Sequence, residues 1–299
     1  MMQNIIQINS VEQFFHLFGY QTEGHPLIGV SRLRGGERYE MKQALQLNLY
    51  AFTCKTGCAG NARYGWRRYD FSTGCLNFYA PGQIIGGEDD NVDTTGAEGW
   101  MVLFHPDFIR RYPLGEQIKR YGFFAYDVSE ALHLSDQEKL HIETIIENIY
   151  REHQVNMDDY TQSIIVTELT LLFNYADRYY ARQFRSRASV EQDRIVQIEQ
   201  LVNRYLETHT MQMITPQAIA EEMNMTTHYL SDLLRKTVGQ NTQQLIHSLL
   251  IDKAKNLLKS TSLSANEIAY RLGFDSPQYF SRLFKQKAGM TPLQFRNTG

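Results

Sequence analysis

The chain has 299 residues, of which 42% are hydrophobic and 21% charged, and its formal net charge is -3. This composition is that of a water-soluble globular protein with room for two domains, and no apolar run approaches the roughly 20 residues that a membrane helix needs. The N-terminal stretch MMQNIIQINSVEQFF lacks the features of a secretory signal, so we expect a cytoplasmic protein with no membrane partner.

Residues 27 to 104 alternate between short β-rich runs and turn-forming clusters. The runs QLNLYAFTC, GCLNFYAPG and WMVLF are separated by segments rich in Gly, Asn and Asp. Such spacing predicts several short strands joined by tight turns. We therefore expect an all-β region, as a small barrel or sandwich.

Two amphipathic helices follow. The first opens with Ser135 and Glu138 at capping-box spacing, and the second covers residues 158 to 182 after a short loop. Apolar residues at helical intervals predict one buried stripe on each helix. These are Leu140, Ile142, Ile145, Ile146 and Ile149 on the first helix, and Ile164, Ile165, Leu169, Leu172, Phe173, Ala176 and Tyr180 on the second. The pair is a predicted helical hairpin, and its stripe fits a dimer seam and burial against the chain's own sheet equally well.

The polar stretch RQFRSRASVEQD is the predicted interdomain linker, and the chain beyond it is predicted to be all helical. Residues before 191 contain 18 Lys and Arg against 23 Asp and Glu, whereas residues 235 to 296 contain 10 against 3. The slightly acidic average therefore hides a basic C-terminal module, as expected of a segment that binds nucleic acid.

This module contains an internal repeat. Residues 219 to 239, IAEEMNMTTHYLSDLLRKTVG, run parallel to residues 268 to 289, IAYRLGFDSPQYFSRLFKQKAG, with one extra residue in the second turn. Each copy predicts a short helix, a tight turn, a hydroxyl N-cap (Thr226 or Ser276), a second helix and a terminal glycine. The pattern is that of two helix-turn-helix units, here called the first unit and the second unit.

Residues 241 to 260 join the two units and contain no glycine or proline. They predict a continuous helix of roughly 30 Å at about 1.5 Å per residue. A spacer of this length holds two recognition helices about 34 Å apart, which is one turn of B-DNA. We therefore expect one chain to recognise two successive major grooves.

The exposed positions in the first and second turns of the two recognition helices are candidates for base contacts: Thr227, His228, Ser231, Asp232, Gln278, Ser281 and Arg282. Gln278 and Arg282 are the strongest candidates, because Gln pairs with adenine and Arg pairs bidentately with guanine. Arg235, Lys285 and Lys287 are placed to bind phosphates, which adds affinity more than specificity. Asp232 repels phosphate, so we expect the first unit to bind more weakly.

Residues 193 to 296 resemble the DNA-binding domain of AraC-family transcriptional regulators. The segment IAYRLGFDSPQYFSRLFKQKAGMTPLQFR is similar to the C-terminal signature of that family nearly position for position. The resemblance covers about a third of the chain. It implies an N-terminal cupin-like domain for effector binding and dimerisation, in agreement with the β-rich region and the hairpin.

No enzymatic or metal site is predicted in the β-rich region. Cys54, Cys58 and Cys75 lack zinc-site spacing, and His25 and His105 lie near the two ends of the region. A cofactor is not expected. For an effector pocket, the aromatic and basic segment NARYGWRRYDF offers the candidates Tyr64, Trp66, Arg67 and Tyr69, since arginine binds acidic ligands and aromatic rings stack on them.

The sequence thus predicts an α+β protein. Its expected parts are a cupin-like β-barrel effector domain (1–126), a dimerising helical hairpin (127–185), a linker (186–192) and an AraC-type DNA-binding domain (193–299). The expected function is sequence-specific regulation of transcription without enzymatic activity. The expected partners are promoter DNA, a small-molecule effector, a second copy of the chain and RNA polymerase. Two alternatives stay open: a cupin-type enzyme with a nucleic-acid-tethering tail, and a constitutive DNA-binding protein whose barrel only dimerises.

Overall fold

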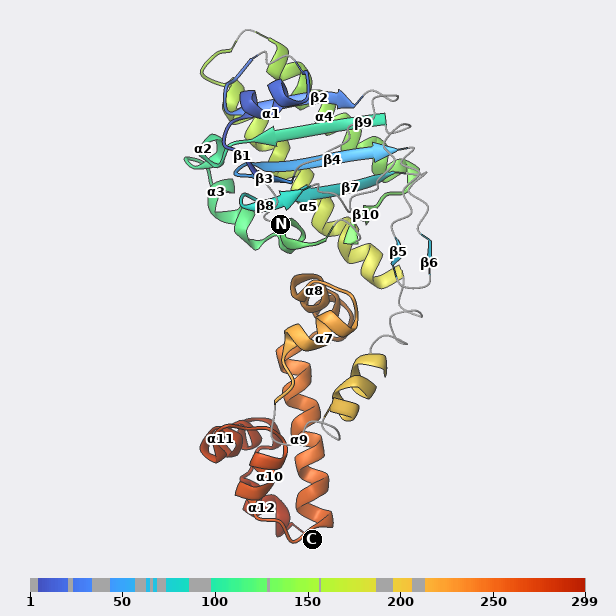
Figure 1. Cartoon of the computed structure of the whole chain (residues 1–299), viewed down its shortest axis with the longest axis vertical. Helices are drawn as coiled ribbons and strands as arrows, with labels where there is room; N and C mark the ends of the chain where they lie inside the picture. Colours follow the sequence, from blue (N-terminus) through green and yellow to red (C-terminus); the bar gives the residue numbers. More distant parts are fainter. Residues whose placement is uncertain are drawn as a thin grey trace. The chain divides into compact units, whose positions relative to one another are not determined.

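The computed structural model describes residues 5–20, 24–33, 44–56, 63–64, 67–68, 74–85, 98–127, 130–155, 157–186, 196–205 and 213–298. The chain divides into two compact units, Met1–Gln183 and Phe184–Gly299. We call these the N-terminal unit and the C-terminal unit. The N-terminal unit combines sheets and helices, and the C-terminal unit is helical (Figure 1). The α+β class and the order of the two parts are as the sequence predicted.

A five-stranded antiparallel sheet forms the centre of the N-terminal unit, in the order β10-β7-β4-β9-β2. The strands are β2 (Ile28–Leu33), β4 (Tyr50–Thr56), β7 (Cys75–Tyr79), β9 (Glu98–Phe104) and β10 (Leu132–His133). Successive side chains point to opposite faces of a strand. Phe52 and Phe104 therefore lie on one face of the sheet, and Ala51 and Leu103 on the other.

A smaller sheet and a short helix cover the second of these faces. The sheet contains β1 (Ile6–Ile8), β3 (Leu45–Leu47) and β8 (Gln83–Ile85), and the helix is α1 (Val11–Leu17). Their apolar side chains form one buried cluster with Ala51, Met101 and Leu103. No helix was predicted for the residues of α1, although Ser10 accepts from the Gln13 amide as its N-cap.

The expected barrel is not closed in the part of the chain that the structure describes. β2 and β10 stand at the two edges of the larger sheet, and β1 and β8 stand at the edges of the smaller one. β10 has only two residues, too few to continue a ladder around a barrel. A two-strand hairpin of β5 (Arg63–Tyr64) and β6 (Arg67–Arg68) completes the described strands. In its described residues, the β-rich region therefore consists of two open sheets and the separate β5-β6 hairpin, closer to the sandwich alternative than to the barrel.

Short helical elements connect β9 to the hairpin: α2 (Pro106–Ile109), α3 (Leu114–Gln117), and the 3-10 helices η1 (Ile118–Arg120) and η2 (Gly122–Ala125). The predicted hairpin follows as α4 (Asp136–Gln154) and α5 (Thr161–Ser186). Ser135 and Glu138 form the predicted capping box of α4. Both helices lie against the larger sheet (Figure 1), and Phe173 of α5 contacts the rings of Phe52, Phe78 and Phe104.

The buried stripe is narrower than predicted. Ile142, Ile145, Ile146 and Ile149 are fully or almost fully buried in α4, but Leu140 is 63% exposed and Ile164 of α5 is 45% exposed. Leu140 lies two residues before Ile142 on α4, which places it about 200° around the helix and away from the sheet. Most residues of the predicted stripe are thus buried within the single chain.

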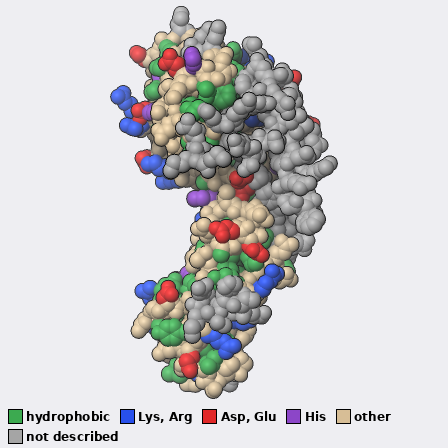
Figure 2. Space-filling view, viewed as in Figure 1, with side chains coloured by type: hydrophobic (Ala, Val, Ile, Leu, Met, Phe, Trp, Pro, Cys, Tyr) green, Lys and Arg blue, Asp and Glu red, His purple; other side chains and the backbone are tan. Residues whose placement is uncertain are grey.

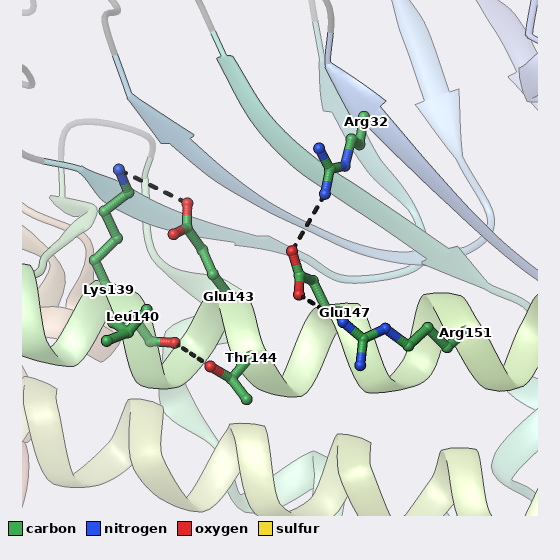
Figure 3. A network of polar contacts seen from close by, with 7 residues as sticks. All are labelled: Arg32, Lys139, Leu140, Glu143, Thr144, Glu147 and Arg151. Carbon is green, nitrogen blue, oxygen red and sulfur yellow. Dashed lines mark hydrogen bonds and ion pairs between the residues drawn. The ribbon is translucent and has the colours of Figure 1, made fainter.

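An ionic network joins α4 to the edge of the larger sheet (Figure 3). The Arg32 guanidinium of β2 lies 3.2 Å from the Glu147 carboxylate, which also pairs with Arg151 at 3.4 Å. Arg32 also covers the ring of Trp100 at 4.6 Å. These contacts fix α4 along β2 through the exposed ends of long side chains.

The described residues of the C-terminal unit include a helix at residues 196–205 and the six helices that follow it. These are α7 (Pro216–Glu222), α8 (Thr227–Val238), α9 (Thr242–Ser260), α10 (Ala265–Arg271), α11 (Pro277–Ala288) and α12 (Pro292–Arg296). The continuous helix α9 is the predicted spacer. It packs with α7 and α8 toward one end and with α10, α11 and α12 toward the other (Figure 1). Among the helices that the structure describes, none has the length and apolar character needed to cross a membrane.

Candidate nucleic-acid interface

The two predicted helix-turn-helix units have matching backbones. The first unit is α7 and α8, and the second is α10 and α11. In the turns, Asn224 has φ 51° and Gly273 has φ 80°, so equivalent positions adopt the left-handed conformation that ends a helix. Asn224 is the one non-glycine residue with positive φ in the part of the chain that the structure describes.

Equivalent hydrogen bonds close the two turns. The Met225 amide donates to the Ala220 carbonyl at 2.8 Å, and the Phe274 amide donates to the Ala269 carbonyl at 3.0 Å. Amides of Asn224 and Gly273 make the second matching pair, each bonding three residues back at 3.0 Å. The additional residue of the second unit is inserted after this turn and before its N-cap, as the sequence comparison predicted.

The recognition helices α8 and α11 begin and end in the same way. The hydroxyls of Thr226 and Ser276 accept from the amides of Tyr229 and Tyr279. Gly239 and Gly289, with φ 73° and 76°, end the two helices. Each helix therefore has a defined first turn, which is the part of a recognition helix that reaches base edges.

Buried apolar side chains hold each unit together. They are Ile219, Ala220, Leu230, Leu233 and Leu234 in the first unit, and Ile268, Ala269, Leu272, Phe280, Leu283 and Phe284 in the second. Met223, which lies near the turn of the first unit, is only half-buried. The remaining faces of α8 and α11 are thus available to a ligand.

The candidates for base contacts lie on those remaining faces. Thr227, His228, Gln278 and Arg282 are exposed, and Ser231, Asp232 and Ser281 are partly buried. The Gln278 side-chain oxygen accepts from the Ser276 hydroxyl at 2.8 Å, which leaves its amide group able to donate. Arg282 makes no ion pair with any residue that the structure describes.

The three candidates for phosphate contacts differ in their surroundings. Arg235 pairs with Asp232 at 2.7 Å, so its charge is partly neutralised within α8. Lys287 instead donates to the Ser248 hydroxyl of α9 at 3.2 Å. Lys285 is exposed. Of the three, Lys285 and Lys287 lie on the second unit, which carries the larger basic surplus.

Charge is mixed over the surface of the C-terminal unit. On the face shown in Figure 2, basic and acidic side chains are interspersed. The basic surplus of residues 235 to 296 therefore forms no single continuous patch on that face. Individual positions on α8 and α11, more than overall charge, decide how this surface could bind a polyanion.

The structure reveals three polar residues on α9 that sequence reasoning missed. His247 contacts Tyr279 of α11, Ser248 contacts Lys287 of α11, and Gln243 contacts His247 within α9. Burial lowers the pKa of His247, and the nearby Lys287 ammonium lowers it further. No local sequence signal identifies the contacts of His247 and Ser248 with α11, because their partners there lie more than 30 positions away.

The side chains of the predicted effector-pocket residues lie outside the described part of the structure. Trp66 and Tyr69 are not described, and Tyr64 and Arg67 are described only in their backbone. Thr53 and Asn77 are opposite one another on the face of the larger sheet that also carries Ala51. Their side chains are buried, with residue exposures of 6% and 7%. Neither Thr53 Oγ1 nor Asn77 Oδ1 has a hydrogen-bond partner among the residues described. Sequence reasoning did not single out this pair.

Within the described ranges, no group of three or more His, Cys, Asp or Glu side chains could hold a metal ion. His25 lies beside the ring of Phe108, with centroids 5.0 Å apart. Burial and the neighbouring His153 both lower the pKa of His25.

Comparison with known proteins locates this arrangement in a family. A family described as "Helix-turn-helix domain" matches residues 219–298. The xylose operon regulatory protein of Escherichia coli (strain K12) is 31% identical over 93 residues, and the transcriptional activator RhaS of Salmonella arizonae is 32% identical over 92 residues. The C-terminal region is an AraC-type helix-turn-helix domain. Each match covers 31% of this chain, and 24% and 33% of the two relatives.

Two solved structures are similar to about a third of this chain. The C-terminal domain of AraT, a response regulator from Geobacillus stearothermophilus, is 35% identical with a TM-score of 0.30 and covers 34% of this chain and 85% of that one. The xylose-binding transcription activator xylR is 27% identical with a TM-score of 0.31, covering 35% of this chain and 27% of that one. The chain spans about a quarter to a third of the length of the curated relatives that it matches.

Proposed function

We propose that this chain is a transcriptional regulator that binds specific sites in double-stranded DNA. The observation that carries the proposal is the pair of matched helix-turn-helix units joined by the continuous helix α9. Its 19 residues make a spacer of about 28 Å, close to one turn of B-DNA. The relatives are themselves named as regulators of transcription.

The second unit supplies most of the specific contacts in this proposal. Gln278 and Arg282 recognise base edges, with Thr227, His228, Ser231, Asp232 and Ser281 as weaker candidates. Exposed Lys285 binds phosphate. Arg235 contributes less because Asp232 already pairs with it, and Lys287 must leave Ser248 before it can reach DNA.

We assign residues 1–126 to effector binding, 127–185 to dimerisation, 186–192 to the linker and 193–299 to DNA binding. Buried Thr53 and Asn77 support an effector site, because unpaired polar atoms inside a sheet sandwich are costly unless a ligand or water satisfies them. A suitable effector is a small polar molecule that donates hydrogen bonds. The pocket candidates Tyr64, Trp66, Arg67 and Tyr69 belong to the same proposal.

Dimerisation through the hairpin would use its outer side rather than the predicted stripe. Leu140, Ile164 and Leu171 are 63%, 45% and 44% exposed on α4 and α5. A cytoplasmic dimer bound at a promoter could also contact RNA polymerase. The enzyme alternative gains no support, since the described residues of the β-rich region offer neither a metal cluster nor a reactive thiol, and burial raises the pKa of Cys54 to about 12.

The test is selection of duplexes from a randomised DNA pool by the purified full chain, followed by Kd measurements on the selected duplex and a random one. Arg282→Ala should weaken binding to the selected duplex by about 1 to 3 kcal/mol and relax one base preference. Lys285→Ala should weaken binding to both duplexes alike and flatten the salt dependence of binding. Equal losses on both duplexes for both variants would contradict the assigned roles, and failure to select any duplex would refute the function.

The constitutive alternative is separated by a screen of small polar metabolites for shifts in melting temperature and DNA affinity. A compound whose shift is lost in Thr53→Val and Asn77→Leu supports effector control. If no compound shifts either property, the constitutive alternative is favoured, in which the β-rich domain only mediates dimerisation.

A further inference from the structure

The second recognition helix carries an arginine placed over an aromatic ring of the same helix. The Arg282 guanidinium carbon lies 5.6 Å from the centre of the Tyr279 ring, within the range of a cation–π contact. An exposed arginine has many rotamers, and ordering it on binding DNA costs entropy. A ring beneath the guanidinium reduces the number of rotamers before DNA arrives.

Tyr279 is itself held from two sides. Its ring packs against Phe274, with centroids 6.0 Å apart, and Phe274 is almost fully buried. Its hydroxyl lies 3.5 Å from Nε2 of His247 on α9. The ring therefore has a fixed support at its base and a polar contact at its tip.

His247 is positioned in turn by the helix that carries it. The Gln243 side-chain nitrogen lies 2.7 Å from His247 Nε2. An amide nitrogen donates, so Nε2 is the acceptor in this contact, and its one lone pair is used by Gln243. The Tyr279 hydroxyl lies beside it at 3.5 Å as a longer polar contact. Burial and Lys287 both favour the neutral imidazole that this role requires.

The first unit lacks this arrangement. In the repeat, Tyr229 stands at the position of Tyr279, but Asp232 stands at the position of Arg282 and pairs with Arg235. The arrangement therefore belongs to the unit whose arginine is the strongest candidate for reading guanine, and it is not a consequence of the shared fold.

We propose that Tyr279 is a positioning residue, held by His247 of α9, that presents Arg282 to a base edge and thereby sets sequence specificity. The inference rests on the proposed function. It adds that His247 of the spacer helix α9 influences the position of Arg282 through Tyr279. Tyr279 itself need not touch DNA.

The test is a double-mutant cycle in the full chain, with the duplex that the wild type selects and a random duplex of equal length as probes. The measured quantity is the ratio of the two Kd values. Tyr279→Leu should reduce this ratio roughly two- to fivefold, the range that an exposed cation–π contact supports. The same change in an Arg282→Ala background should reduce it no further. Tyr279→Phe, which keeps the ring, should retain most of the ratio.

Two controls keep the result interpretable. Tyr270→Leu removes an exposed aromatic ring of the same unit, 47% exposed on α10, and should leave the ratio unchanged. If Tyr279→Leu melts near the assay temperature, His247→Leu carries the test, because it removes the hydroxyl contact and keeps the ring. Its smaller loss should also vanish in the Arg282→Ala background.

Additive losses in the two backgrounds, or equal weakening of both duplexes, would overturn the inference and leave the proposed function standing. If the wild type selects no duplex, the proposed function and this inference fail together.

Discussion

The Asp232 carboxylate lies 2.7 Å from the Arg235 guanidinium, three residues further along α8. The matching positions of α11 hold Arg282 and Lys285, two cations with no acidic residue between them. The two units therefore share a backbone but differ in charge where a recognition helix meets DNA. This difference makes the second unit the stronger binder in our account.

Asp232→Asn should strengthen binding to a random duplex, because it removes a negative charge and frees Arg235 for a phosphate. We expect a rise in affinity of roughly two- to fivefold at low salt and a salt slope steeper by up to about one. Fluorescence anisotropy over a salt series measures both. Asp252→Asn is the matched control, since Asp252 pairs with Lys255 at 2.8 Å on α9. An equal gain in the control variant would show that only net charge matters.

Asn224→Ala should destabilise the C-terminal unit. Its φ of 51° places it in the left-handed region, which costs an ordinary residue roughly 1 to 2 kcal/mol and costs glycine almost nothing. We expect a loss of about 1 kcal/mol in the free energy of unfolding, measured by circular dichroism in denaturant. Asn224→Gly should not destabilise the unit. A neutral Asn224→Ala would contradict the turn geometry of the first unit.

Phe173→Ala should strongly destabilise the N-terminal unit. This fully buried ring contacts aromatic rings of three strands, and removal of a core phenylalanine costs about 3 to 5 kcal/mol. Tryptophan fluorescence in denaturant reports this unit alone, because Trp66 and Trp100 both lie in it. Leu171→Ala, at a 44% exposed position two residues earlier, should change stability by at most about 0.5 kcal/mol. Similar losses for both variants would show that α5 does not pack as described.

Cys54 should resist alkylation in the folded protein at neutral pH. The residue is 1% exposed, and burial raises the pKa of its thiol to about 12, well above the ordinary value of 9.0. Because the pKa is raised, this group stabilises the fold below pH 9 and loses that contribution as the pH rises toward 12. Mass spectrometry after iodoacetamide treatment should find Cys54 modified only in denaturant. Full modification in buffer would place Cys54 at the surface.

Much of the C-terminal unit could be predicted from the sequence because its determinants are local. Hydroxyl N-caps at Thr226 and Ser276 and glycine ends at Gly239 and Gly289 act within a few residues. Because these signals recur in both copies, they show which residues of the two units correspond. The uninterrupted helix α9 followed equally from the absence of glycine and proline.

Contacts between distant parts of the chain could not be predicted from the sequence. Leu140 has helical spacing relative to other apolar residues, yet which of them face the sheet depends on how α4 is rotated against β2. Lys287 belongs to a basic segment, but its contact with Ser248 depends on how α9 and α11 pack. Barrel closure likewise depends on strand pairing, which alternation within single strands does not determine.

In the proposed complex with DNA, the two recognition helices of one chain occupy adjacent major grooves of a duplex. A hydroxyl-radical footprint of the full chain on its selected duplex tests this most directly. Our account predicts two protected segments about 10 base pairs apart, one helical turn, with the segment that depends on Arg282 protected at lower protein concentration. Protection of a single segment, or none, would contradict it.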